Sequence, residues 1–239
     1  MLDGLKLGVY QTFVLNHNYT YYTKGIQITL LVTALALVLG VILGVLVASV
    51  RSAHDQQSGT KRNFSLGFLN VICKIYLTVI RGTPMMVQLL IMWFVVWASA
   101  RSSTGNMIRC AVLAFGINSG AYVAEIVRAG IMSVDKGQME AGRSLGFNYI
   151  QTMRFIIIPQ AFKNILPALG NELITLLKET SIVTVIGLKD LTKGAMIIQS
   201  NTYQALVPYL ALAGIYLALV MILSMLVGKM ERRLRSSDH

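Results

Sequence analysis

The chain has 239 residues, of which 55% are hydrophobic and 13% are charged, and its formal net charge is +11. A soluble domain carries about 25% charged residues, so this composition is too poor in charge to cover a surface that faces water. The basic residues are scattered between apolar runs and form no aromatic-studded groove, which argues against nucleic-acid binding. The composition therefore favours a protein inserted in a membrane.

Five apolar segments along the chain are long enough to cross a bilayer. About 20 apolar residues cross a hydrocarbon core of about 30 Å, and the first segment, 25–50, contains no charged residue. The others are expected at 66–100, 107–128, 162–188 and 205–228, with a polar loop at 131–160. We therefore expect an all-α integral membrane protein, a single domain over residues 1–239, with five transmembrane helices and its termini on opposite sides.

The first span contains the sequence GVILG, in which Gly40 and Gly44 lie on one helical face. Small residues at this spacing allow another helix to approach closely. Such pairs are also frequent by chance, so a role in dimer formation is only one of the alternatives.

The distribution of lysine and arginine predicts the orientation, because cytoplasmic segments carry an excess of these residues. We expect the N-terminus outside and the C-terminus in the cytoplasm, which places twelve basic residues inside and half as many outside. The inner set is Arg51, Lys61, Arg62, Arg128, Lys136, Arg143, Arg154, Lys163, Lys229, Arg232, Arg233 and Arg235, and the outer set is Lys6, Lys24, Arg101, Arg109, Lys189 and Lys193.

The polar loop contains the sequence EAGRSLGFNYIQTMRFIIIP, which predicts two short helices joined by a glycine corner. The first helix presents a small-residue face that includes Ala141 and Gly142, and it ends at Gly146, a residue suited to a left-handed cap. The second begins at Asn148 as N-cap and must stop before Pro159.

Two functions fit such a hairpin. Its small-residue face could meet another protein, with Glu140 and Arg143 fixing the register, or the hairpin could lie on lipid headgroups with Met153 and 156–158 as anchors. Periodicity alone does not separate these alternatives.

A resemblance separates them. The letters EAG at 140–142, Gly146 and IIIP at 156–159 are similar to the EAA loop of ABC-importer permeases, whose pattern is EAA, three residues, G, nine residues, IxLP. The chain departs from that pattern at Gly142 and Ile158, and both replacements keep small size or apolarity. The stretches RGTPMMVQL, EIVRAGIMSVDKGQ and PQAFKNILPALGNELITLLKETS resemble the polar amino-acid branch, so the resemblance covers about residues 25–227.

The resemblance implies a type I ABC importer permease fold in a prokaryotic inner membrane. It implies two cytoplasmic ABC ATPase subunits, a second permease subunit that is identical or related, and an extracytoplasmic amino-acid-binding protein, besides the membrane lipid. ATP and Mg would bind the ATPase subunits and no cofactor would bind this chain. The residues that the resemblance assigns to ATPase coupling are Glu140, Ala141, Gly142, Gly146 and Pro159.

The motif RGTP interrupts the second apolar segment. Pro84 removes a helix donor and disfavours helical backbone at Thr83, so the helix should kink or restart there with Thr83 as a possible N-cap. Broken helices in membranes lie against protein or a wet cavity. Arg81 could therefore contact substrate, or it could anchor the helix at the cytoplasmic surface.

Charged residues within spans are a second indication of a pathway, because each costs about 2.5–3.5 kcal/mol at a helix centre on insertion scales. Glu125 and Arg128 lie one turn apart and could form a local ion pair. Glu172 and Lys178 could bind an amino-acid zwitterion or form ion pairs between subunits. The predicted pathway residues are Arg81, Thr83, Gln88, Asn118, Glu125, Glu172, Lys178 and Thr180.

The sequence lacks the signals that are typical of other classes of protein. The histidines, His17, His54 and His239, lie in termini or a linker, so we expect neither a catalytic constellation nor a metal site. The phosphate-binding pattern GxxxxGK[ST] is absent, so this subunit is not expected to be an enzyme and ATP hydrolysis would occur on another chain. A secondary transporter driven by an ion gradient is the alternative, although such folds are usually built from paired repeats.

Overall fold

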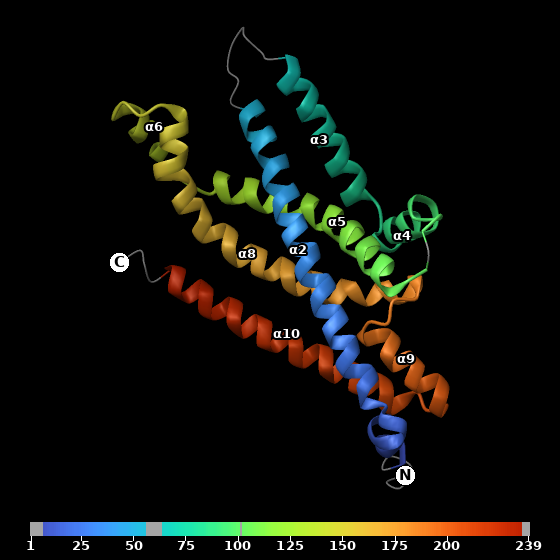
Figure 1. The fold of residues 1–239 in the computed structure, drawn as a ribbon. Coiled ribbons are helices and arrows are strands. Elements are labelled where there is room, and N and C mark those ends of the chain that lie inside the picture. Colours follow the sequence, from blue (N-terminus) through green and yellow to red (C-terminus); the bar gives the residue numbers. More distant parts are fainter. Residues whose placement is uncertain (1–6, 56–63, 101, 236–239) are drawn as a thin grey trace. The chain divides into compact units, whose positions relative to one another are not determined.

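The structure is a computed structural model that describes residues 7–55, 64–100 and 102–235, and this part of the chain contains helices and no strands (Figure 1). The all-α class predicted from the sequence is confirmed. The α-helices are α2 (Tyr19–Asp55), α3 (Phe64–Gly82), α4 (Met85–Ile91), α5 (Thr104–Met132), α6 (Lys136–Ser144), α7 (Tyr149–Thr152), α8 (Ile158–Glu179), α9 (Leu191–Thr202) and α10 (Leu206–Arg235). Shorter 3-10 or π segments are η1 (Tyr10–Val14), η2 (Leu15–His17), η3 (Met92–Val96), η4 (Met153–Ile157) and η5 (Thr180–Ile186).

Four of the described helices are long and apolar enough to cross a membrane, namely α2, α3, α5 and α10. The segment predicted at 66–100 is broken, because α3 ends at Gly82 and α4 begins after Pro84, whose backbone is extended. The apolar stretch from α4 through η3 is shorter than a span. The number of five transmembrane helices therefore stays a prediction.

Contacts divide the chain into two compact units. The first contains residues 1–36, 84–115 and 174–223, and the second contains 37–83, 116–173 and 224–239.

In the second unit, α2 and α5 approach each other through paired glycines. A Cβ atom on Gly40 would lie 2.9 Å from the Cβ of Ser119, and one on Gly44 would lie 2.5 Å from Cγ1 of Val123. The two glycines of the GVILG sequence therefore face α5 of the same chain. Their small size is explained by packing within the subunit.

The facing surface of α5 carries the same spacing of glycines. A Cβ on Gly116 would lie 2.6 Å from Cδ2 of Leu39, and one on Gly120 would lie 2.9 Å from the Cβ of Leu43. The hydroxyl group of Tyr76 on α3 donates a hydrogen bond to a carbonyl oxygen of α5 in the same region. The glycines and this bond fix α2, α3 and α5 against one another.

The core of the first unit is a cluster of buried side chains from the start of α2 and from α9: Tyr22, Leu191, Ala195 and Ile198. The hydroxyl group of Tyr22 donates a hydrogen bond of 2.9 Å to the carbonyl oxygen of Pro208 in α10. A Cβ atom on Gly25 would meet the backbone of Leu191 at 2.7 Å, so α2 and α9 touch closely.

Asp190 caps the N-terminus of α9 from a fully buried position. Its carboxylate accepts hydrogen bonds from the backbone N–H groups of Lys193, at 2.9 Å, and Thr192, at 3.1 Å. Burial raises the pKa of Asp190 from 3.8 to about 6, although the hydrogen bonds oppose this shift. The fold therefore buries a carboxylate that titrates close to neutral pH.

The α2–α5 contact predicts the effect of adding one methyl group. In Gly44→Ala, the new Cβ would meet Cγ1 of Val123 and the backbone nitrogen of Ala124, which lies 2.9 Å away and cannot move without the helix. Overpacking of this kind costs about 1–3 kcal/mol of unfolding free energy. Gly214→Ala is the matched control, because nothing lies within 4 Å of the added atom. Thermal unfolding in detergent should show a lower Tm for Gly44→Ala alone, and equal shifts would contradict the contact.

Asp190 predicts a pH dependence of stability. Since its pKa is higher in the folded chain, its contribution is most favourable below pH 3.8 and is lost as the pH rises through about 6. Asp190→Asn keeps an N-cap acceptor without a charge to bury. We expect the Tm of the variant relative to the native protein to rise between pH 4 and pH 7. A difference that is constant over this range would contradict the assignment.

Candidate coupling loop and polar pathway

The predicted coupling loop begins with α6, whose N-cap is Asp135. The carboxylate of Asp135 accepts a hydrogen bond of 2.7 Å from the backbone nitrogen of Gly137. Glu140 and Ala141 are exposed, whereas Gly142 is buried. The helix therefore presents the first two residues of the motif to the outside and turns the third inward.

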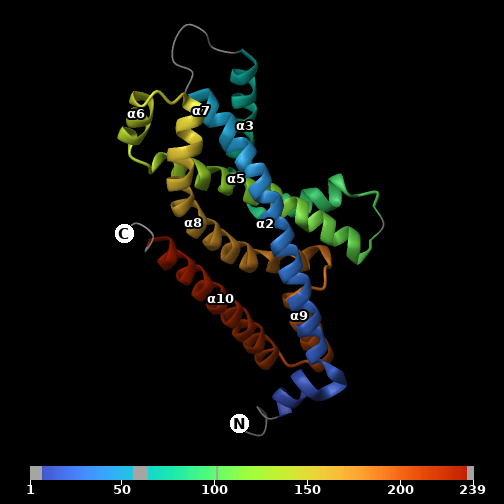
Figure 2. The same cartoon turned by 60° about the vertical axis from the view of Figure 1, so that its left-hand side comes forward.

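Gly142 packs against the second half of the loop. A Cβ at this position would lie 2.6 Å from Cγ2 of Thr152 and 3.0 Å from Cδ1 of Ile156. From the sequence, the small residue at 142 could allow a protein partner to approach. In the structure, Gly142 is small because Thr152 and Ile156 of the same hairpin occupy the space beside it. Figure 2 shows α6 and α7 side by side next to the beginning of α8.

The corner between the helices has the geometry predicted from the sequence. Gly146 has a φ of +85°, which confirms the left-handed cap. Its N–H donates to the carbonyl oxygen of Arg143, and the N–H of Phe147 donates to the carbonyl oxygen of Gly142, the two bonds of a Schellman motif. A β-carbon at Gly146 would be strained although the space around it is open.

The second helix begins at a complete capping box, which confirms Asn148 as its N-cap. The side chain of Asn148 accepts from the backbone of Gln151, and the side chain of Gln151 accepts from the backbone of Asn148, each at 2.9 Å. The prediction that this helix stops before Pro159 is wrong, because helical backbone continues from α7 through η4 into α8, whose second residue is Pro159. The π-helical turn η4 directly precedes Pro159, whose ring removes one backbone donor from the helix.

Side-chain hydrogen bonds join α8 to the hairpin and to the turn that precedes the hairpin. The amide of Gln160 donates to the side-chain oxygen of Gln138 at 3.3 Å, and the amide of Asn164 donates to the hydroxyl group of Ser133 at 2.8 Å. The hairpin nevertheless exposes large apolar side chains, which on a polar loop mark an interaction surface. These are Leu145, Phe147, Tyr149, Ile150 and Phe155, with Leu145 and Ile150 more than 70% exposed.

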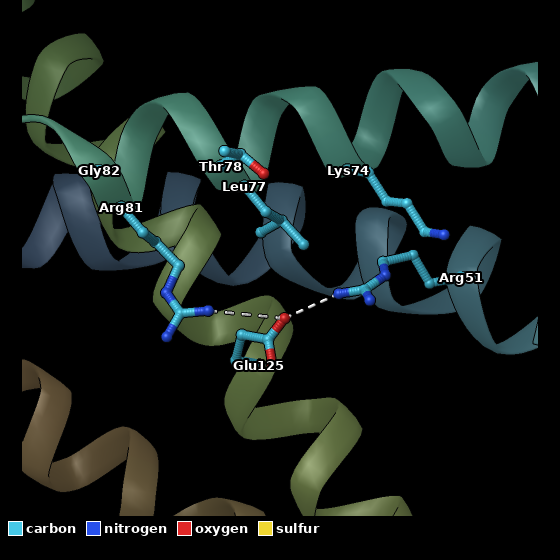
Figure 3. Close-up of a pocket in the computed structure, with 7 residues that line it drawn as sticks. All are labelled: Arg51, Lys74, Leu77, Thr78, Arg81, Gly82 and Glu125. Atoms are coloured by element: carbon cyan, nitrogen blue, oxygen red, sulfur yellow. Dashed lines mark hydrogen bonds and ion pairs between the residues drawn. The ribbon is translucent and has the colours of Figure 1, made fainter.

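Among the predicted pathway residues, Arg81 and Glu125 lie together in the second unit (Figure 3). Glu125 Oε1 accepts a hydrogen bond of 2.7 Å from Nη1 of Arg51 and lies 3.8 Å from Nη1 of Arg81. The guanidinium group of Arg81 also lies 5.9 Å from the ring centroid of Tyr122. Arg128 lies 3.8 Å from a carboxylate oxygen of Asp55, so the structure pairs Glu125 and Arg128 with different residues and not with each other.

Thr83 does not act as the N-cap that the sequence suggested. Its hydroxyl group donates a hydrogen bond of 2.8 Å to the carbonyl oxygen of Val79 at the end of α3, and Pro84 occupies the N-cap position of α4 without a side-chain bond. The hydroxyl group therefore satisfies a backbone carbonyl oxygen near the C-terminal end of α3. The break predicted at this motif is confirmed.

The remaining pathway residues belong to both units. In the second unit, Asn118 is buried, and the hydroxyl group of its neighbour Ser119 donates a hydrogen bond of 2.7 Å to Oε1 of Glu172. In the first unit, Lys178 is exposed near the end of α8. Thr180 is fully buried, and its hydroxyl group donates to the carbonyl oxygen of Leu177.

Gln88 lies in the middle of α4, also in the first unit, and is half-buried. No group of three or more potential metal-ligating side chains occurs in the part of the chain that the structure describes.

Two polar partners in these sites are not predicted from the sequence. The sequence indicated Arg51 only as one of the basic residues that predict orientation. In the structure it lies closer to the carboxylate of Glu125 than Arg81 does, at 2.7 Å against 3.8 Å. Ser119 bonds Glu172 across two helices. The polar pair Asn118–Ser119 inside a span could have indicated this site, whereas nothing local indicates which carboxylate Arg51 meets.

Known proteins resemble this chain over most of its length. The arginine transport system permease protein ArtQ of Bacillus subtilis (strain 168) is 43% identical over an alignment of 185 residues, and the match covers 72% of this chain and 84% of that protein. The glutamine transport system permease protein GlnP of Escherichia coli (strain K12) is 36% identical over 178 residues, 74% of this chain and 81% of that protein.

Solved structures of transporters also resemble this chain. An amino acid ABC transporter crystallised with histidines superimposes with a TM-score of 0.80 at 44% identity and covers 90% of this chain and 95% of that one. The MetNI methionine ABC transporter in an inward-facing conformation has a TM-score of 0.72 at 18% identity, which shows the fold alone; it covers 90% of this chain and 97% of that one. Residues 40–236 match the binding-protein-dependent transport system inner membrane component, and the chain belongs to this family.

Proposed function

We propose that this chain is the transmembrane subunit of an ATP-driven importer that moves a polar amino acid into the cell. The exposed apolar surface of the α6–α7 hairpin, next to exposed Glu140 and Ala141, is the observation that carries the proposal. A membrane subunit needs such a surface if ATP is hydrolysed on another chain. The arginine and glutamine permeases among its relatives favour a polar amino acid as substrate.

The proposed assembly contains two ABC ATPase subunits, which hold ATP and Mg, a second permease subunit, identical or related, and an extracytoplasmic amino-acid-binding protein. The N-terminus lies outside and the C-terminus in the cytoplasm, as the lysine and arginine distribution predicts. The hairpin then faces the cytoplasm and meets an ATPase subunit. Glu140, Ala141, Gly142, Gly146 and Pro159 couple ATP hydrolysis to transport by shaping and presenting that surface.

The geometry of the hairpin supports force transfer. Gly146 and the capping box at Asn148 fix both helix ends, and the contact of Gly142 with Thr152 holds the helices together. Gln138 in the hairpin bonds to α8, and so does Ser133 in the turn before the hairpin. A displacement of the exposed surface is therefore passed to α8.

The proposed substrate pathway contains the polar set Gln88, Asn118, Glu172, Lys178 and Thr180. A carboxylate and a cation suit the two charges of an amino acid, and charged groups within membrane helices usually face a cavity or a partner. Arg81, Thr83 and Glu125 belong to the wider predicted set, although each also has a local partner in the second unit.

Gly146 provides the test of coupling. Gly146→Val places a β-branched side chain at positive φ and should abolish amino-acid-stimulated ATP hydrolysis or release the ATPase subunit, while Gly146→Asn, which tolerates this backbone, should retain most of the stimulation. The measurement is ATPase activity of the reconstituted complex with its binding protein. Normal stimulated hydrolysis in Gly146→Val would refute the role of the corner.

Glu172 provides the test of the pathway. Glu172→Gln keeps the size of the side chain and removes its charge, so uptake by reconstituted complexes should show a KM raised about tenfold or more, or a changed preference among amino acids. Asn171→Ala, an exposed neighbour on the same helix, is the control. Unchanged KM and selectivity in Glu172→Gln would remove Glu172 from the pathway.

A further inference from the structure

The second unit contains a pocket of about 490 Å³ between α2, α3 and α5, within the range of small-molecule sites (Figure 3). The charged residues that line it are Arg51, Lys74, Arg81 and Glu125. Arg51 and Arg81 reach the carboxylate of Glu125 from opposite sides, and Lys74 extends from α3 on the side of Arg51. None of the coupling residues lines this pocket.

The charges of the pocket do not balance. The lining contains three cations and one carboxylate, so it carries two positive charges in excess. Glu125 is engaged by Arg51 at 2.7 Å, and Arg81, at 3.8 Å, is too far away for a hydrogen bond to it. Lys74 has no ion pair among the residues that the structure describes. An anion in the pocket would be stabilised by donors that the protein leaves available.

The donors suit a phosphate group. Lys74, Thr78 and Arg81 lie four and three residues apart on one face of α3, and all three are exposed. A guanidinium group offers parallel N–H donors that match two phosphate oxygens, and an ammonium and a hydroxyl group add further donors. The side chain of Arg81 is 46% exposed, so an anion can reach it.

An apolar surface continues from the pocket along α3. Phe68, Ile72, Ile75 and Val79 lie at helical spacing on the adjacent face, and each is between 48% and 61% exposed. The helix is apolar enough to cross a membrane, and only 11% of its most apolar window is buried. A ligand with a phosphate and long alkyl chains would contact both surfaces at once, whereas free phosphate would contact only the pocket.

We propose that this pocket binds the headgroup of an anionic phospholipid through Lys74, Thr78 and Arg81, with the acyl chains along the apolar face of α3. Basic pockets between membrane helices are suited to such headgroups. The site gives Arg81 an anchoring role in place of contact with the transported amino acid. It also links a lipid to Glu125 and Arg51, and thereby to the contact between α2 and α5.

Lipid retention tests the proposal independently of transport. The full chain, purified with the subunits that remain bound to it, is placed in nanodiscs of phosphatidylglycerol and phosphatidylcholine, and retained lipids are counted by native mass spectrometry. Lys74→Gln and Thr78→Val break no ion pair in the described chain, so both should fold. We expect the native protein to retain phosphatidylglycerol, and Lys74→Gln to lower its apparent affinity about tenfold. Lys24→Gln, at an exposed position on α2, should have no effect.

Three results would overturn the proposal. Equal retention of phosphatidylglycerol in Lys74→Gln, Thr78→Val and Lys24→Gln would show that the pocket does not hold the headgroup. A Lys74-dependent rise in Tm with inorganic phosphate, without retained lipid, would assign the pocket to a free anion. Displacement of phosphatidylglycerol by the transported amino acid would assign it to the substrate pathway.

Discussion

The close contact between α2 and α5 is the constraint on which the second unit depends. Glycines on both helices, Gly40 and Gly44 on α2 and Gly116 and Gly120 on α5, let the backbones approach until side chains of one helix fill the gaps on the other. In a bilayer, where burial of apolar surface does not drive helices together, such packing and interhelical hydrogen bonds hold the structure. The same contact brings the end of α2 within reach of Glu125, so the ion pair with Arg51 follows from it.

Glycine serves the α6–α7 hairpin in two different ways. Gly142 provides space for the neighbouring helix, as the membrane glycines do, whereas Gly146 provides a backbone conformation that other residues reach only with strain. Together they produce a compact hairpin that is fixed at its corner and at its bases and that still exposes apolar side chains. These features are the ones that the proposed mechanical link to an ATPase requires.

The sequence predicted the features that depend on local rules. The apolar composition predicted an all-helical membrane protein, Gly146 and Asn148 predicted their caps, and Pro84 predicted the break before α4. Contacts between helices could not be predicted in the same way. Glu125 pairs with Arg51 and not with the nearby Arg128, because tertiary packing, and not helical spacing, decides which charges meet. Likewise Gly142 and the GVILG glycines serve contacts within the chain that no short sequence pattern distinguishes from contacts with a partner.

The most direct test of the central claim is uptake of a labelled polar amino acid by proteoliposomes that contain this chain, its ATPase subunits and its binding protein. An ATP-driven importer should accumulate the amino acid only when ATP is present on the side of the ATPase, and should do so without any ion gradient. Accumulation by the chain alone, driven by a proton or sodium gradient and independent of ATP, would contradict it.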